Sequence, residues 1–321
     1  MAILITGVAG FIGSHLAKKF LAQGDEIIGI DNLCRGSLRN IAEIQLNPKF
    51  TFSDIDLSEL GHYQSLIAEY QQAHTITEVW HLAANSDIPA GISNAQIDLR
   101  DTFLTTYNTL EVMRKFNIPT IAFASTSAVY GNLGEQVLTE DIGPLFPISN
   151  YGAMKLASEA LISASVESFL NSAYIFRFPN VIGAPATHGV IIDFINKLKS
   201  TPENLNVLGN GTQQKSYLHI EDLIDAMFSI RNQEKAPLNY FNIGAGDDGI
   251  SVHDIAEIVV DTVSPNASIS YGEGDKGWVG DVPRFKYSIE KLKRLGWAPK
   301  LNSVEAVRLA VKQILADESQ K

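Results

Sequence analysis

Short runs of apolar residues recur through the first half of the chain and once more near residue 240, each bounded by turn residues. Uninterrupted runs of this length are typical of strands that are buried on both faces of a parallel sheet. The predicted strands are Ala2–Thr6, Glu26–Asp31, Lys49–Ser53, Glu78–Leu82, Thr120–Ser125, Ala173–Phe178 and Tyr240–Ile243.

Helix-like segments lie between most of these runs. Strands that alternate with helices build a parallel sheet with helices on both faces, so the first half predicts an α/β fold with a Rossmann doubly wound sheet. The predicted helices are Phe11–Gln23, Ile41–Leu46, Gly61–Ala73, Asp98–Phe116 and Tyr151–Leu170.

The pattern changes beyond Phe178, where prolines and glycines interrupt it. Shorter helices are expected at Glu221–Ile230 and Val252–Val263, and Asn302 is suited to cap a last helix to about Ala316, followed by a frayed end at 317–321. We therefore predict a Rossmann domain over residues 1–178, which also receives the strand at 240–243, and a smaller α/β lobe over most of 179–321.

Composition and charge exclude several classes of protein. Of 321 residues, 45% are hydrophobic and 19% are charged, which supports a sizeable core. A net charge of −11 without a cluster of Lys and Arg argues against nucleic-acid binding. The single cysteine, Cys34, can form no internal disulfide, which fits a reducing compartment, and we expect the cytoplasm. The apolar runs are too short for a signal peptide or a membrane span, so we expect an unprocessed protein without a membrane partner.

Glycines recur three positions apart directly after the first predicted strand, at Gly7, Gly10 and Gly13. Glycine allows a tight turn and a close approach to a pyrophosphate, and a helix that begins at Phe11 and Ile12 would present free N–H groups to it. Such a triplet alone is as often a structural loop, but its place between a strand and a helix indicates a dinucleotide site.

A carboxylate stands at the end of the second strand, where the dinucleotide's ribose is expected. Asp31 lies 18 positions after Gly13 and would accept hydrogen bonds from the ribose hydroxyls and repel a 2′-phosphate, which favours NAD over NADP. Arg35 is the one nearby residue that would suit a 2′-phosphate. Asp54 and Ile55 are candidates to flank the adenine, although Asp54 equally fits an ordinary turn.

Hydroxyl groups gather at the end of the fifth strand, at Ser125, Thr126 and Ser127, followed by Tyr151 and Lys155. A Tyr and a Lys four positions apart share one helix face, so the ammonium can lower the phenol's pKa. Lowering that pKa from ~10 to ~7 requires roughly 4 kcal/mol of preferential stabilisation of the phenolate. An isolated Tyr and Lys at this spacing more often belong to an ordinary helix face. The glycine turn, the run of hydroxyl groups and this pair occur here in that order, which favours a catalytic site.

Other chemistries have weaker support. The seven histidines show no i,i+4 or Cys-paired spacing, so no zinc site is expected, and His81 at a strand end fits a structural role. Ser125 and Ser127 lack the context of a hydrolase nucleophile. No metal is predicted.

Taken together, these residues resemble the extended short-chain dehydrogenase/reductase superfamily, in its branch of nucleotide-sugar epimerases, dehydratases and decarboxylases. The likeness covers nearly the whole chain. It rests on the glycine turn, Val79–Ala84, Ser125–Gly131, Tyr151 with Lys155, Arg177–Val181, Gly209–Gln213, His219–Asp222, Asn242–Gly244, Gly280–Pro283 and Leu295–Trp297.

The resemblance implies roles for particular residues. Tyr151 would be the base, Lys155 would bind the nicotinamide ribose, and Thr126 would hydrogen-bond the sugar O4. It implies an NAD-binding first domain and a substrate-binding second lobe, and a homodimer built from helices 98–116 and 151–170. Further NAD contacts are implied at Asn32, Leu82, Ala83, Ala84 and Ser125, and substrate contacts at Asn85, Asn180, Lys215 and Phe285.

The positions after Thr126 favour one reaction within this branch. Dehydratases and decarboxylases place an acid two positions after the catalytic Ser or Thr, often with another acid before it, but Ser127 and Ala128 stand here, and alanine exchanges no proton. The expectation is a UDP-glucose/UDP-galactose 4-epimerase, for which a bulky Phe285 would disfavour N-acetyl sugars.

Several departures and alternatives stay open. Trp278 and Lys215 stand where relatives carry phosphate-binding arginines, and Thr102 stands where relatives commonly carry Asn. The alternatives are a keto-sugar reductase, an epimerase of UDP-N-acetylhexosamine or UDP-uronate, epimerisation at C2, and a regulatory protein that binds the cofactor without chemistry.

Overall fold

The computed structural model describes residues 1–134, 136–274 and 286–319, and the chain divides into two compact units. The first unit comprises residues 1–131, 145–177 and 230–241, and the second comprises 132–144, 178–229 and 242–321. Residues 132–144, 178 and 242–243 belong to the second unit and residues 230–239 to the first, so the division differs from the predicted one at these places. None of the helices in the described residues is long and apolar enough to cross a membrane.

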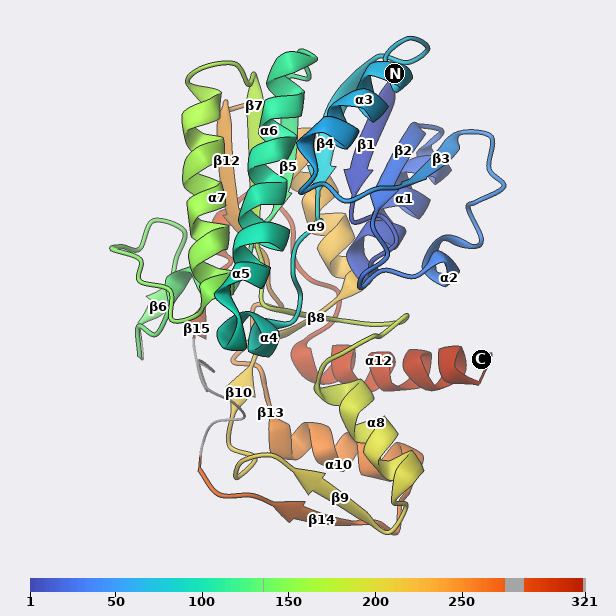
Figure 1. Ribbon diagram of the computed structural model, residues 1–321. Coiled ribbons are helices and arrows are strands. Elements are labelled where there is room, and N and C mark those ends of the chain that lie inside the picture. The colour runs from blue at the N-terminus through green and yellow to red at the C-terminus, as the bar shows by residue number, and fades with distance from the viewer. Residues whose placement is uncertain (135, 275–285, 320–321) are drawn as a thin grey trace. The chain divides into compact units, whose positions relative to one another are not determined.

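A seven-stranded sheet forms the centre of the first unit, in the order β12-β7-β5-β4-β1-β2-β3 (Figure 1). From β3 to β7 every neighbouring pair is parallel, so the chain winds outward from β1 in both directions, as in a doubly wound Rossmann sheet. The predicted fold class is confirmed. The strands are β1 Ala2–Thr6, β2 Glu26–Asp31, β3 Phe50–Asp54, β4 Ile76–His81, β5 Thr120–Ala124, β7 Ser172–Arg177 and β12 Leu238–Asn242.

The helices of this unit follow the strands as the alternation predicted. All five residues of β1 are buried, and the helix after it ends at Gly24, whose left-handed backbone (φ +88°) favours glycine. The main helices are α1 Phe11–Gln23, α3 Leu60–Tyr70, α4 Ile88–Ser93, α5 Ala95–Asp98, α6 Thr105–Lys115 and α7 Asn150–Val166. A buried apolar cluster from β1, β4, β5, β7, α3 and α6 forms the core.

Two predicted helices were partly wrong. The helix expected at 41–46 is the single turn α2, Leu38–Ile41, capped by the Ser37 hydroxyl. The helix expected at 98–116 is interrupted by a π-helical segment, Leu99–Leu104, between α5 and α6.

The 3₁₀ turn Ser127–Tyr130 follows β5. The capping box at Asn302 is confirmed, but the last helix continues through Glu318 instead of fraying after Ala316.

The second unit consists of short strand pairs and helices. β8 Asn180–Ile182 pairs with β11 Tyr217–His219, β9 Asn204–Val207 pairs with β14 Ser268–Tyr271, and β10 Gln214–Lys215 pairs with β13 Ile250–Ser251. β6 Val137–Leu138 pairs with β15 Lys286–Tyr287. The helices are α8 Val190–Ser200, α9 Ile220–Gln233, which ends in the first unit, α10 Val252–Val263, α11 Glu290–Lys293 and α12 Ser303–Glu318. Helices α8, α10 and α12 enclose a second apolar core.

Candidate active site

The glycine turn between β1 and α1 is close-packed. A Cβ on Gly13 would lie 2.1 Å from the Gly7 carbonyl oxygen, and one on Gly7, whose φ is +70°, would lie 2.8 Å from the Ala83 nitrogen. The first bond of the helix runs from the Ser14 N–H to the Gly10 carbonyl, so the N–H groups before it lie ahead of the helical ladder. The turn therefore presents backbone donors and a positive helix end at the sheet's carboxyl edge.

Asp31 lies beside this turn at the end of β2. Its carboxylate accepts hydrogen bonds from the N–H groups of Ala9 (3.0 Å) and Leu33 (2.9 Å) and is buried. Burial raises the pKa of Asp31, and these backbone hydrogen bonds oppose the rise. Asp54 lies opposite Asp31 in register on β3, so both carboxylates stand at the same sheet edge; Asp54 is exposed and Ile55 is half-buried.

Arg35 is engaged with another residue. Its guanidinium pairs with the Asp87 carboxylate, which also caps α4 by accepting the Ala90 N–H. A 2′-phosphate would have to compete with Asp87 for Arg35, as well as with the charge of Asp31. Asn32 accepts the Cys34 N–H in a local turn.

The residues after β4 form the other side of this edge. The Thr6 hydroxyl accepts the N–H groups of Leu82 (3.2 Å) and Ala83 (3.3 Å), and the latter residue packs against Gly7. Ala84 is half-buried, and the buried Asn85 donates to Asp98. The candidate NAD contacts from β1, β2 and β4 thus lie along one continuous edge of the sheet.

Thr126 and Tyr151 lie together at the end of β5. Ser149 caps α7 by accepting the Gly152 N–H (3.1 Å), and a Cβ on Gly152 would lie 2.6 Å from the Ala128 carbonyl oxygen. The start of α7 therefore approaches the segment after Thr126 closely, and Tyr151 hydrogen-bonds to Thr126. The Thr126 hydroxyl oxygen also accepts the Ala128 N–H (3.1 Å).

Lys155 is buried one turn beyond Tyr151. Its ammonium donates to the Ala124 carbonyl (2.6 Å) and lies 5.9 Å from the centre of the Tyr151 ring. Burial lowers the pKa of Lys155 to about 7, and Glu159 opposes that change. Burial raises the pKa of Tyr151 to about 12, opposed by the hydrogen bond to Thr126 and reinforced by the charge of Asp98. This direction is the opposite of the one that a base at neutral pH requires.

A buried ion pair, Glu159 with Arg177, lies beside Ser125, and no sequence pattern predicted it. The Arg177 guanidinium donates to both oxygens of Glu159 (2.6 to 3.2 Å) and to the Tyr130 hydroxyl (3.0 Å). Ser125 donates to the same carboxylate. The available signal was an arginine ending the otherwise apolar β7 and a glutamate four positions after Lys155 on α7.

His81 is fully buried in a network of hydroxyl groups. Its Nδ1 lies 2.8 Å from the Thr6 hydroxyl and its Nε2 lies 3.2 Å from the Thr106 hydroxyl. Burial lowers the pKa of His81 to about 3, with a smaller effect from Lys155. The imidazole is therefore neutral at ordinary pH and links the glycine turn to α6.

The substrate candidates Asn180 and Lys215 belong to the second unit. Asn180 on β8 pairs in register with Tyr217 on β11, and Lys215 lies two positions before Tyr217 on β10. Residues 35 positions apart in the sequence are thereby brought near each other. Phe285 and Trp278 lie outside the described residues.

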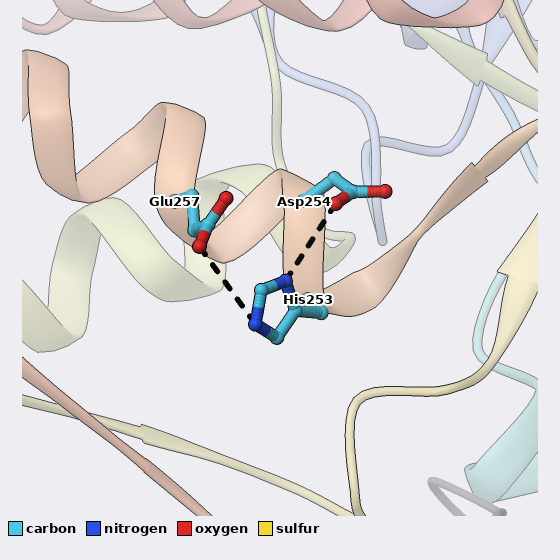
Figure 2. A group of neighbouring side chains, drawn as sticks. All are labelled: His253, Asp254 and Glu257. Carbon is cyan, nitrogen blue, oxygen red and sulfur yellow. Dashed lines mark ion pairs between the residues drawn. The ribbon is translucent and has the colours of Figure 1, made fainter.

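One group of possible metal ligands occurs in the described residues, at the start of α10. Figure 2 shows His253 between two carboxylates, with Nδ1 3.6 Å from Asp254 and Nε2 3.7 Å from Glu257. All three side chains are exposed, and Asp254 already accepts the Ser251 hydroxyl. No sequence motif marked this group; contacts of the exposed imidazole with the two carboxylates on one solvent-facing helix turn account for it.

Comparison with known proteins adds to this geometry. The model of the NAD dependent epimerase/dehydratase family matches residues 3–244. The chain belongs to that family. Its cofactor is NAD, and the glycine turn and Asp31 fit such a dinucleotide.

Three relatives illustrate the range of activities in the family. A protein of Methanocaldococcus jannaschii, provisionally named UDP-glucose 4-epimerase, is 30% identical over 96% of this chain and 97% of its own length. The dTDP-glucose 4,6-dehydratase of Haemophilus influenzae is 28% identical, with 99% of each chain covered. A crystal structure of a UDP-galactose 4-epimerase is 32% identical, with a TM-score of 0.84 and 99% of each chain covered.

Proposed function

We propose that this protein is a nucleotide-sugar 4-epimerase and that it interconverts UDP-glucose and UDP-galactose. The observation that carries the proposal is the grouping of Thr126, Tyr151 and Lys155 at the sheet edge. The two residues after Thr126 are Ser127 and Ala128, so no acid stands there. This set suits reversible proton removal from one hydroxyl group. The 30% and 32% identical relatives carry epimerase names, which supports the proposal.

Tyr151 takes the proton of the sugar's C4 hydroxyl and later returns it to the 4-keto sugar. Thr126 donates its O–H to the same oxygen, while its own oxygen accepts the Ala128 N–H. When bound, NAD supplies the acceptor and donor for the hydride at C4. Rotation of the keto sugar between the two transfers inverts C4.

Activation of Tyr151 requires positive charge near the phenol, since burial alone raises its pKa to about 12. Lys155 supplies part of that charge when it is protonated, and bound NAD would add to it. Tyr151 therefore favours the phenolate only when the site is loaded. Before loading, the tyrosine stays protonated.

Dehydration is the competing reaction, because a 28% identical relative is a dTDP-glucose 4,6-dehydratase. Removing water from C5 and C6 needs an acid and a base beside the 4-keto sugar. The hydroxyl of Ser127 and the methyl group of Ala128 supply neither at neutral pH. A 4-keto sugar in this site is therefore reduced again.

We assign NAD binding to the first unit, through Gly7, Gly10, Phe11, Ile12, Gly13, Asp31, Asn32, Asp54, Ile55, Leu82, Ala83, Ala84 and Ser125. We assign sugar-nucleotide binding to Asn85 and, in the second unit, to Asn180 and Lys215, with Lys215 as the diphosphate's cation. We also propose a homodimer formed through α6 and α7, whose outer faces expose Tyr107, Ala160 and Ala164. Light scattering that gives the mass of one chain would refute the dimer.

The decisive experiment incubates the purified protein with UDP-galactose and follows the sugar's anomeric proton by NMR. Parallel samples contain UDP-N-acetylglucosamine, UDP-glucuronate and dTDP-glucose, each with and without added NAD. We expect UDP-galactose to become UDP-glucose without net consumption of cofactor.

Each of the other outcomes identifies a different activity. A methyl signal from dTDP-glucose would indicate a dehydratase, and net conversion of the added NAD to NADH would indicate an oxidoreductase of the reductase type running in reverse. Silence with every substrate, with NAD present, would contradict the proposed epimerase.

A further inference from the structure

Asp98 is a fully buried carboxyl group at the end of α5, directly before the π-helical segment. One of its oxygens accepts the Asn85 amide at 2.8 Å. The other oxygen is also inaccessible to solvent and has no hydrogen-bond partner. Among the described residues no Lys, Arg or His forms an ion pair with Asp98. Burying a carboxyl group with one unsatisfied oxygen lowers the stability of the fold, which is typical of a residue retained for a functional reason.

The unsatisfied oxygen faces the segment that holds the start of α7. A Cβ on Gly91 in α4 would lie 1.8 Å from it, so only glycine fits there. The Gly91 carbonyl in turn accepts the Asn150 amide at 2.9 Å, and Asn150 is the first residue of α7, directly before Tyr151. Asp98 and Asn150 thus contact the same glycine from different elements.

Burial raises the pKa of Asp98, the hydrogen bond from Asn85 opposes the rise, and the charges of Asp101 and Asp87 add to it. Asp87, at the start of α4, is paired with Arg35, and Asp101, on the π-helical segment, is paired with Arg100. From α7 the titratable groups are Tyr151 and Lys155, and Lys155 donates to the Ala124 carbonyl. A charge buried away from water acts over a longer range than an exposed one, and Asp98 is close enough to raise the pKa of Tyr151.

We propose that Asp98 is a positioning residue for Tyr151: it packs against Gly91, whose carbonyl holds Asn150 at the start of α7, and its negative charge holds the proton on the phenol. It keeps Tyr151 protonated until positive charge from the assembled site outweighs it. Asp98 does not touch the sugar. The inference rests on the proposed role of Tyr151 and adds a residue that sets its proton affinity.

The test is an ultraviolet titration of the NAD-loaded protein, since phenolate absorbs at longer wavelength than phenol. Each protein is compared with the same protein that also carries Tyr151→Phe, so the difference isolates one of the ten tyrosines. In Asp98→Asn the amide oxygen can still accept from Asn85, but the charge is gone. We expect ionisation of Tyr151 to move down by about one pH unit, because removing a nearby negative charge favours phenolate.

Asp101→Asn is the matched control, because it removes the same charge from the adjacent segment but from a residue already neutralised by Arg100. We expect a much smaller shift. If Asp98→Asn does not fold, Asp98→Ser removes the charge with a smaller side chain and is titrated in the same way. An unchanged Tyr151 titration in the folded Asp98 variant, or an equal shift in Asp101→Asn, would overturn the inference. The titration uses no sugar, so its result is independent of whether UDP-galactose is the substrate.

Discussion

The two compact units use their buried carboxylates for different purposes. In the second unit, Asp222 accepts the backbone N–H groups of Lys300 and Leu301, and Glu140 accepts that of Asn242. In the first unit, Glu159 binds Arg177 and Ser125, while Asp98 lies near Tyr151. Asp222 and Glu140 fix loops of the second unit, as Asp31 fixes the glycine turn of the first, whereas Glu159 and Asp98 lie beside the residues proposed to move a proton.

This difference follows from what each carboxylate contacts. A backbone N–H stabilises a buried charge without adding a second one, so it holds a loop and leaves the field outside small. A guanidinium or a phenol is itself titratable or charged, so a carboxylate beside it also sets proton affinities. Substitutions beside the proposed proton-transfer residues of the first unit should change rates and pH profiles, and substitutions at the proposed substrate contacts of the second unit should change substrate affinity.

The largest effect is expected at Tyr151. We predict that Tyr151→Phe lowers kcat for UDP-galactose by about a thousandfold, because general acid–base catalysis of one proton transfer is typically worth 10² to 10⁴. NAD should remain bound, since the ring is kept. NMR turnover assays measure the loss. Tyr174→Phe makes the same change in the middle of β7, away from the proposed site and dimer surface, and should leave kcat unchanged. Comparable activity in the two variants would remove Tyr151 from the mechanism.

The next effect concerns stability. Glu159→Gln leaves the buried Arg177 guanidinium without its counter-charge, so we expect a loss of about 3–5 kcal/mol in the free energy of unfolding. Asp222→Asn keeps an oxygen that can accept from the backbone and should cost only about 1 kcal/mol. Urea unfolding compares the two. Equal losses would show that a carboxylate paired with a guanidinium and one bonded to backbone N–H groups contribute alike to stability.

A pH dependence of stability is expected from Lys155, whose pKa falls from 10.5 to about 7 on burial. Between these values the unfolded chain binds the proton that the folded chain has released. Stability contributed at this site therefore rises with pH across that window, by at most about 1.4 kcal/mol per pH unit. Urea unfolding of the wild type and of Lys155→Met between pH 7 and 9.5 gives the difference. A flat difference would show that Lys155 stays charged in the folded protein.

The smallest effect is expected in the second unit. Lys215→Ala should raise KM for UDP-galactose about tenfold with kcat nearly unchanged, because an interaction with the diphosphate is equally strong in the ground and transition states. Lys215→Arg should lower KM, since a guanidinium binds phosphate through two parallel hydrogen bonds. Lys300→Ala, at an exposed position of the same unit, is the control. A fall in kcat instead of a rise in KM would contradict the division between the units.

The sequence by itself determined the first unit's architecture. The bounds of β1, β2 and α1 agree with the prediction to the residue, because a fully buried strand and a glycine-bounded helix leave a local pattern. The same holds for the glycine turn proposed to bind NAD, since its glycines, Asp31 and the flanking elements are close in the sequence. Thr126, Tyr151 and Lys155 could be named as candidates because each lies at a predictable strand end or helix turn.

Only the tertiary structure decided how the charged and polar residues behind that site are paired. The π-helical segment, the Glu159–Arg177 pair and the isolation of Asp98 have no periodicity that a sequence could display. Whether a carboxylate is solvated, paired or left alone depends on contacts between residues far apart in the chain. Those contacts set the local dielectric and the neighbouring charges, and therefore the proton affinities of the residues that the sequence could name.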